Sequence, residues 1–284
     1  MQHTKKIALF INPVSGAGLA VKTGNWLNTQ LSSRGIDHHL FATGWPENLD
    51  ACLEAWIVGG DGTANYFINK YRNQLDIPLV LFKGGTGNDI AWRLYGNIGR
   101  DELLHKALTA RPQKVDAAEC NGQLFVNSSG IGFDGEVVRS GKTIRRIGGH
   151  LGYLLVVLRK ILSFREPIFG IATETAGYSE KFLLVAVNNS SRTGGGFLVT
   201  PNASITDGRL DMLLCKPLGF WKRLRYLPVI EKGKHLQLPF IIHSLEKEVT
   251  VTASRELYAH LDGELIYAKR FHFKVLPGAL TIKW

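Results

Sequence analysis

A glycine-rich turn directly after the apolar run at residues 56–58 is the segment best suited to hold phosphate. It carries one carboxylate among small residues, Gly59, Gly60, Asp61, Gly62 and Thr63. Glycines let backbone N–H groups approach a phosphate closely, and a helix that begins at Thr63 adds the positive end of its dipole. The turn favours a nucleotide triphosphate, although similar glycine pairs also occur in ordinary strand-to-helix turns.

Two more turns of this kind lie in the first third of the chain. The apolar run at residues 7–11 leads into Asn12-Pro13, and the run at 79–82 leads into a segment with Thr86 and Asn88. Each turn precedes apolar residues at helical spacing. Strands that alternate with amphipathic helices predict a mostly parallel, doubly wound sheet covered on both faces. Because the carboxyl ends of parallel strands share one edge, we expect the three turns to converge on one crevice.

The pattern changes near residue 111. Asn121-Gly122 joins two short strand-like runs, which is a strong hairpin signal, and further short β-type runs follow at 182–187, 210–214, 249–252 and 271–276. We predict an α/β nucleotide-binding domain over residues 1–114 and a mainly antiparallel, sandwich-like β-rich domain over residues 115–284. We expect about the last ten residues to pack back on the first domain.

Composition limits the partners and the compartment. The chain of 284 residues has 34 Lys and Arg against 24 Asp and Glu, a formal charge of +10, which favours anionic partners. Its three cysteines show neither disulfide nor zinc spacing, and the histidines show no metal-ligand spacing. No secretory signal or membrane-spanning run is evident. We expect a cytoplasmic protein that is soluble or at most peripheral to a membrane.

Two stretches, residues 144–164 and 218–234, combine large apolar side chains with clustered bases. The first contains Arg145-Arg146 and Arg159-Lys160, and the second contains Trp221, Lys222-Arg223 and Arg225. They suit a surface that docks on an anionic membrane. The alternative, favoured on the residues alone, is a pair of helices with solvated basic faces.

Several motifs occur in a fixed order along nearly the whole chain. They are Asn12-Pro13-x-Ser15-Gly16, the turn at residues 59–63, the turn at 85–89, Asn127-x-Ser129, Asn188-Asn189, Asp207-Gly208 and Asp262-Gly263-Glu264. This order resembles the diacylglycerol kinase catalytic-domain family of lipid kinases, which includes sphingosine and ceramide kinases. The size of the chain is similar to that of the soluble bacterial members. The resemblance implies a two-domain kinase with its nucleotide between the domains.

The resemblance also implies which residues contact ATP and Mg²⁺. The nucleotide contacts are Asn12, Thr43, Gly59, Gly60, Asp61, Gly62, Thr63, Asn65, Thr86 and Asn88. Phosphoryl transfer requires positioning and charge neutralisation, so Asp61 is expected to hold magnesium or its water, while Thr63 offers a hydroxyl to a phosphate. The chain departs from the family at Tyr66, where a glutamate usually stands, so it lacks one carboxylate beside the expected nucleotide.

The resemblance implies that the base lies in Asp262-Gly263-Glu264. On the residues alone Asp-Gly is an ordinary hairpin turn. Both carboxylates are candidates, one removing the proton of the attacking hydroxyl and the other orienting the first or shifting its pKa. The roles of Asp262 and Glu264 stay unassigned at this point.

A structural magnesium is implied near Asp207-Gly208-Arg209. In the family the ion is held by the Asp207 carboxylate and by backbone carbonyls, here those of Ser204 and Arg209. Hard oxygen ligands of this kind suit the ion.

The expected function is therefore an ATP-dependent lipid kinase that phosphorylates a lipid hydroxyl, diacylglycerol-like or related, at the inter-domain cleft. An NAD kinase shares the glycine turn and the two-domain plan, although the first and third turns favour the lipid branch. A nucleotide-sensing or nucleic-acid-binding module is the other alternative, supported only by the charge. Which lipid is used, and the oligomeric state, stay open.

Overall fold

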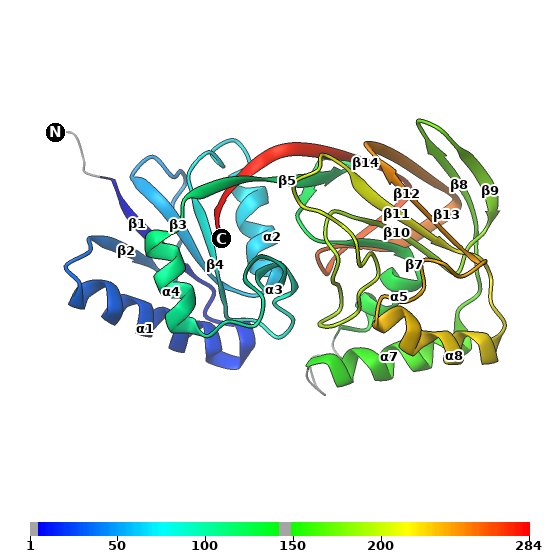
Figure 1. Cartoon of the computed structure of the whole chain (residues 1–284), viewed down its shortest axis with the longest axis horizontal. Helices are drawn as coiled ribbons and strands as arrows, with labels where there is room; N and C mark the ends of the chain where they lie inside the picture. Colours follow the sequence, from blue (N-terminus) through cyan, green and yellow to red (C-terminus); the bar gives the residue numbers. More distant parts are fainter. Residues whose placement is uncertain (1–4, 142–148) are drawn as a thin grey trace. The chain divides into compact units, whose positions relative to one another are not determined.

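The computed structural model describes residues 5–141 and 149–284 and divides the chain into two compact units. The first comprises residues 1–115 and 278–284, and the second comprises residues 116–277. Strands β5 and β14 contain residues of both units (Figure 1). The fold class expected from the sequence is confirmed, because a parallel α/β unit is followed by an antiparallel β-rich one.

The first unit is a parallel sheet with helices between its strands. Its elements are β1 (Lys6–Ile11), a 3₁₀ turn (Ser15–Gly18), α1 (Leu19–Ser33), β2 (His38–Phe41), β3 (Cys52–Gly59), α2 (Asp61–Lys70), β4 (Leu79–Lys83), α3 (Asp89–Tyr95) and α4 (Arg100–Thr109). The strand order is β14–β4–β3–β1–β2, where β14 contributes its C-terminal end. Strands β1, β3 and β4 are buried almost throughout, as expected of strands covered on both faces.

Helix α2 begins at Asp61 rather than at Thr63, where the sequence pattern placed its start. Gly60 has extended backbone and forms the N-cap, so the first turn already includes the carboxylate of Asp61. An acidic side chain in the first turn is stabilised by the helix dipole. The glycine turn is therefore shorter than expected, and Asp61 and Gly62 are helical residues.

The second unit is a largely antiparallel β structure with three helices described on it. Its elements are β5 (Pro112–Cys120), β6 (Gln123–Phe125), β7 (Ser129–Gly132), α5 (Phe133–Arg139), α7 (Gly149–Ser163), β8 (Ile168–Thr173), β9 (Gly177–Lys181), β10 (Leu184–Asn188), β11 (Leu210–Cys215), α8 (Phe220–Glu231), β12 (Ile241–Glu246), β13 (Glu248–Leu261) and β14 (Glu264–Lys283). The strand order is β12–β11–β10–β7–β13–β14, extended by β8–β9 beside β13 and by β5–β6 beside β14.

Two apolar clusters support the second unit. One packs side chains of the strands together, including Phe125, Phe271 and Phe273. The other packs α5, α7 and α8 against β10 and β11 through residues such as Val157 and Leu213. Both two-residue hairpins predicted from the sequence are confirmed, since Cys120 pairs with Gln123 and Leu261 pairs with Glu264.

Within the described ranges, no helix has both the length and the apolar character needed to cross a bilayer. The cysteines Cys52, Cys120 and Cys215 are buried and unbonded. Burial raises the pKa of the Cys120 and Cys215 thiols to about 12, so both stay protonated and unreactive at neutral pH.

A buried histidine makes the stability of the second unit sensitive to pH. The His235 side chain is fully buried, and its Nε2 donates to the Val199 carbonyl at 2.8 Å. Burial lowers the pKa of His235 below its ordinary value of 6.5, with a smaller effect from His243. The unfolded chain therefore binds a proton at a higher pH than the folded chain does, and the contribution of His235 to stability is lost as the pH falls below 6.5.

Replacing His235 with Gln tests this effect. We expect the wild-type free energy of unfolding to decrease more than that of His235→Gln between about pH 7 and about pH 5, because only the wild type must charge this group on unfolding. Denaturant titrations at both pH values measure the difference. Identical pH dependence in the two proteins would contradict the assignment.

Candidate active site

The three glycine turns of the first unit lie against one another, as the sequence pattern predicted. A Cβ built on Gly16 would lie 2.3 Å from the carbonyl oxygen of Gly84, and one built on Gly85 would lie 2.3 Å from the Cα of Gly60. Only glycine permits these backbone approaches. The turns after β1, β3 and β4 therefore form one continuous edge of backbone.

Asn12 connects the first turn to helix α2. Its Nδ2 donates to the Oγ1 of Thr63 at 2.9 Å, and its Oδ1 accepts from the backbone N–H of Val14 at 3.2 Å. The Thr63 side chain reaches this position because Gly59 lacks a Cβ, which would lie 2.4 Å from the hydroxyl. Asn12 thus orients the Thr63 hydroxyl at the start of α2, beside the positive end of the helix.

A groove of about 480 Å³ runs along the start of α2. Four of the residues in its walls were predicted to contact the nucleotide, Asn12, Thr43, Gly62 and Thr63, and the other wall residues include Trp45, Tyr66 and Lys70. The Tyr66 ring is 57% exposed and lies 5.4 Å from the Trp45 ring, so the two rings form an aromatic wall of the groove. Lys70 adds a cation. The spacing of residues 62, 66 and 70 along one helix face could have identified Lys70 as a residue of this groove.

The third turn is closed by its own asparagine. Asn88 has a left-handed backbone (φ 54°), its Oδ1 accepts from the Gly85 N–H at 2.8 Å, and its Nδ2 donates to the Gly85 carbonyl at 2.7 Å. Thr86 is exposed. Neither Thr86 nor Asn88 is among the described walls of the groove. Asn88 therefore shapes the turn with the amide that was expected to face a nucleotide.

Asp61 and Asn65 also make contacts within the protein. The Oδ1 of Asp61 accepts from the backbone N–H of Ile90 at 2.9 Å, which links α2 to the start of α3. Asn65 is 7% exposed and accepts from the Asn69 side chain at 3.2 Å. Asp61 thus connects the turn after β3 to the turn after β4. The described walls of the groove do not include Asn65.

Replacing Gly85 with Ala tests the contact between the turns. The new methyl group would overlap the backbone of Gly60, and we expect the free energy of unfolding to decrease by about 1–3 kcal/mol. Gly99→Ala is the matched control, because nothing lies within 4 Å of its Cβ position. Thermal denaturation of both variants provides the measurement. Equal melting temperatures would contradict the close packing of the turns.

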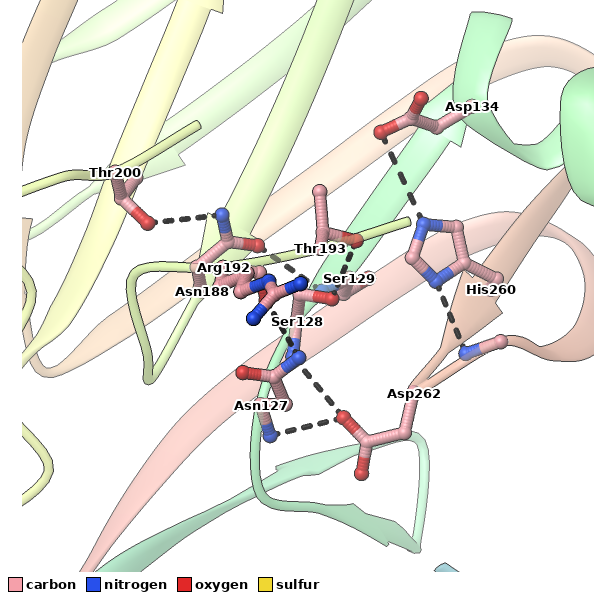
Figure 2. Close-up of polar contacts among 11 residues, drawn as sticks. Asn127, Ser128, Ser129, Asp134, Asn188, Arg192, Thr193, Thr200, His260 and Asp262 are labelled. Carbon is pink, nitrogen blue, oxygen red and sulfur yellow. Dashed lines mark hydrogen bonds and ion pairs between the residues drawn. The ribbon is translucent and has the colours of Figure 1, made fainter. Parts of the chain in front are cut away.

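In the second unit, both oxygens of the Asp262 carboxylate accept hydrogen bonds from backbone N–H groups. Its Oδ2 accepts from the N–H of Val126 at 2.9 Å, and its Oδ1 accepts from Asn127 at 2.8 Å and Ser128 at 3.0 Å. Figure 2 shows the Asp262 carboxylate beside Asn127 and Ser128. The side chain is 5% exposed. These three bonds tie the β13–β14 turn to that loop.

Glu264 follows this anchored turn and has a different environment. Asp262 and Gly263 both have positive φ (52° and 89°), the geometry of a two-residue hairpin turn that fits the strand twist. Glu264 is exposed and begins β14. The two carboxylates of the Asp-Gly-Glu segment are thus a buried anchor and an exposed acid.

The remaining motif residues of the second unit form a buried polar network (Figure 2). Asn127 Nδ2 donates to the Arg192 carbonyl at 2.6 Å, and Ser128 Oγ donates to Thr193 Oγ1 at 2.9 Å. Asn188 Nδ2 donates to Thr200 Oγ1 at 3.0 Å. The first two bonds join segments 65 residues apart in sequence and hold the loop that receives Asp262.

A buried histidine supports the same turn and was not identified from the sequence. His260 Nδ1 accepts from the Gly263 N–H at 3.3 Å, and its Nε2 lies 3.8 Å from Asp134 Oδ2. His260 is 3% exposed. No local pattern identifies this pair, because its members are brought together only by the packing of α5 on β13.

The predicted metal ligands lie in the loop before β11. Asp207 Oδ1 accepts from the Arg209 N–H at 3.0 Å, and the Gly208 N–H donates to Asp116 at 2.8 Å. Burial raises the pKa of Asp207, and the carboxylates of Asp211 and Asp116 raise it further. The Asp207 carboxylate and the backbone carbonyls of this loop are oxygen donors of the type that hard metal ions prefer. In the described parts of the chain, no cluster of three His, Cys, Asp or Glu side chains is set to hold a metal.

Family models match almost the entire chain. The diacylglycerol kinase catalytic domain matches residues 6–120, and the YegS C-terminal NAD kinase beta sandwich-like domain matches residues 127–284. The chain belongs to the diacylglycerol kinase family. It is accordingly a lipid kinase, a phosphotransferase that acts on an alcohol group.

Individual relatives agree with this family. A diacylglycerol kinase from Mycobacterium tuberculosis is 27% identical over 97% of this chain and 92% of its own length. The structure of a candidate diacylglycerol kinase from Bacillus anthracis superimposes with a TM-score of 0.79 at 24% identity, covering 100% of this chain and 98% of the other. An NAD kinase from Archaeoglobus fulgidus, in complex with ATP, is a more distant fold neighbour, with a TM-score of 0.57 at 12% identity over 98% of this chain and 93% of the other.

Proposed function

We propose that this protein transfers the γ-phosphate of ATP to the hydroxyl of a diacylglycerol-like lipid. The observation that carries the proposal is the difference in environment between the two carboxylates of the Asp-Gly-Glu segment. Asp262 is held by three backbone N–H groups, and the turn that it anchors presents the exposed carboxylate of Glu264. A general base must reach the hydroxyl that it deprotonates, so Glu264 is the base and Asp262 is a positioning residue.

In this proposal the groove along α2 binds ATP. The first turn of a helix has backbone N–H groups without acceptors inside the helix, which suits the phosphates. Thr63, oriented by Asn12, supplies a hydroxyl, and Lys70 supplies positive charge. Magnesium, when bound, neutralises charge that develops on the phosphates. Asp61 would hold it or its water, and Asp207 with the carbonyls of Ser204 and Arg209 would hold a structural ion.

An apolar cavity in the second unit supports a lipid acceptor. It measures about 70 Å³ beneath α8, and side chains of α7, β10 and α8 line it, among them Val157, Leu184, Tyr226 and Leu227. Helix α8 has no buried residue. A single acyl chain is larger than this cavity, which would hold only part of a lipid tail. The apolar walls suit hydrocarbon and do not suit the polar groups of NAD.

An acceptor panel tests the proposed reaction. Purified protein is incubated with γ-labelled ATP, magnesium and one acceptor at a time, either diacylglycerol in mixed micelles, NAD or no acceptor. We expect label in the organic phase only with diacylglycerol, and none with Asp61→Ala. Label transferred to NAD would establish the alternative suggested by the distant NAD kinase. Nucleotide binding without transfer would indicate a sensing module.

We also propose that the start of α8 docks on anionic membranes. Trp221 is 79% exposed beside Phe220 at 37%, and the exposed cations Lys222 and Arg225 follow on the same helix. Leu162 at the end of α7 is 70% exposed. Aromatic rings with neighbouring cations suit the headgroup region of a bilayer.

Two of the basic residues predicted for the docking surface form ion pairs within the protein. Lys160 pairs with Glu136 at 2.8 Å. Arg223 pairs with Glu166 at 2.5 Å and donates to the carbonyls of Ile161 and Phe164 at the end of α7. Arg223 therefore fastens α8 to α7, whereas Lys222, Arg225 and Arg159 are exposed. Arg145 and Arg146 lie outside the described residues.

Vesicle sedimentation tests the docking surface. We expect the protein to sediment with anionic vesicles and not with zwitterionic ones, less at high salt, with Trp221→Ala weakening the interaction several-fold. Leu53→Ala, an exposed apolar residue of β3, is the control and should sediment like wild type. Equal sedimentation of wild type and Trp221→Ala would exclude this surface.

A further inference from the structure

A second, polar hollow lies in the second unit, separate from the apolar cavity. It measures about 420 Å³, and its walls come from α5, the end of α7 and the β13–β14 hairpin. Helix α5 contacts both α7 and β13, and Figure 1 shows α7 below α5. Four cationic side chains line it together with two carboxylates and two tyrosines: Arg139, Lys160, Arg165, Arg255, Glu136, Glu256, Tyr258 and Tyr267.

An irregularity in β13 brings Arg255 to the hollow. Thr252 pairs with Arg270 and Leu257 pairs with Ala268, so residues 253–256 stand opposite Lys269 alone. Such a bulge bends the strand and redirects side chains. Arg255 and Glu256 belong to this bulge and line the hollow. A regular strand would have placed alternate residues of this segment on the apolar core instead.

Contacts inside the protein hold Arg139 in position. Its guanidinium lies 4.5 Å from the centre of the Tyr258 ring and 3.5 Å from Glu136. The Tyr258 ring packs in turn on Tyr267 at 4.6 Å. Glu136 also accepts from Lys160 at 2.8 Å, so one carboxylate serves two cations. A guanidinium held in this way loses little conformational entropy when it binds a ligand.

The charge of the hollow is not balanced by the protein. Four cations face two carboxylates. Within residues 5–141 and 149–284, Arg165 and Arg255 have no acidic partner within 4.0 Å. The surplus of two positive charges matches a phosphate monoester, which carries about −1.5 to −2 near neutral pH. Guanidinium groups bind phosphate oxygens through paired hydrogen bonds, and tyrosine hydroxyls add donors.

We propose that this hollow is a binding site for a phosphate monoester, either free phosphate or the headgroup of a phosphorylated lipid. Arg139 of α5 and Arg255 of the β13 bulge are its principal ligands. The volume accommodates a phosphate with a short polar attachment but not a folded partner. The proposal does not depend on the kinase reaction, because it concerns residues of the second unit outside the groove and the Asp-Gly-Glu turn.

Calorimetric titration of the full chain tests the site with three probes, inorganic phosphate, dihexanoyl phosphatidic acid and dihexanoyl phosphatidylcholine. We expect the first two to bind, and Arg255→Gln and Arg139→Gln each to weaken that binding about tenfold or more. Tighter binding of the phosphatidic acid than of phosphate identifies a lipid headgroup as the ligand, and equal binding identifies free phosphate. Lys181→Gln, an exposed cation of β9 outside the hollow, should bind like wild type.

A further variant separates this hollow from the groove along α2. If the measured phosphate binds in the groove, Lys70→Gln will weaken it and Arg255→Gln will not, which would overturn the proposal. Absence of phosphate and phosphatidic acid binding to wild type, or equal binding of phosphatidylcholine, would also overturn it. A variant that loses binding should retain the wild-type melting temperature, since Arg255 is exposed.

Discussion

Replacing Glu264 with Gln is expected to lower kcat for lipid phosphorylation by about 10²- to 10⁴-fold, the range typical of losing a general base. The melting temperature should not change, because Glu264 is exposed. The KM for ATP should change little, since this side chain belongs to the β-rich unit and not to the groove along α2. Steady-state kinetics with lipid in mixed micelles measures all three quantities together with a thermal melt.

The matched control is Glu174→Gln, which removes an exposed carboxylate from the β8–β9 turn of the same unit. It should retain wild-type kcat. If Glu264→Gln keeps more than about a tenth of wild-type kcat, Glu264 is not the base. If it loses activity and melts at a lower temperature as well, the side chain has a structural role that its exposure does not indicate.

Replacing Asp262 with Asn is expected to lower the free energy of unfolding by about 3 kcal/mol and to abolish most activity. Three backbone N–H groups donate to the two carboxylate oxygens, and an Asn amide leaves only one acceptor oxygen for them. A buried donor without a partner costs about 1–3 kcal/mol. Asn tolerates the left-handed backbone at φ 52°, so the variant isolates the lost hydrogen bonds from backbone strain.

Denaturant titration of Asp262→Asn beside Glu264→Gln separates the anchor from the base. The two substitutions are neighbours in one turn, yet only the first should destabilise the protein. A fully stable but inactive Asp262→Asn would reverse the assignment and make Asp262 the base. A stable and active variant would exclude both roles.

Local patterns predicted the first unit well because its geometry follows from its strand type. In a parallel sheet the turns after β1, β3 and β4 must meet at one edge, and Gly16, Gly60 and Gly85 show contacts that a Cβ would prevent. The roles of individual polar side chains were harder to predict from the sequence. Asn88 uses its amide to close its own turn, and nothing in the run of glycines distinguishes that role from a nucleotide contact.

In the second unit the important contacts join distant segments. The partners of Asp262 lie at residues 126–128, and those of Arg223 lie at the end of α7, so spacing within either segment gives no sign of them. Family resemblance located the Asp-Gly-Glu segment, but only the geometry distinguished its buried anchor from its exposed acid. The same applies to Lys160, which belonged to a basic cluster in the sequence and pairs with Glu136 in the fold.

The central claim is that phosphate passes from ATP to a lipid hydroxyl. The most direct measurement is the stoichiometry of ADP and phosphorylated lipid formed by the purified protein from ATP, magnesium and diacylglycerol in mixed micelles. We expect one ADP for each lipid that gains one phosphate, identified by mass spectrometry, and about 10²- to 10⁴-fold slower product formation by Glu264→Gln. ADP formed with inorganic phosphate alone, or with NADP when NAD is supplied, would contradict the claim.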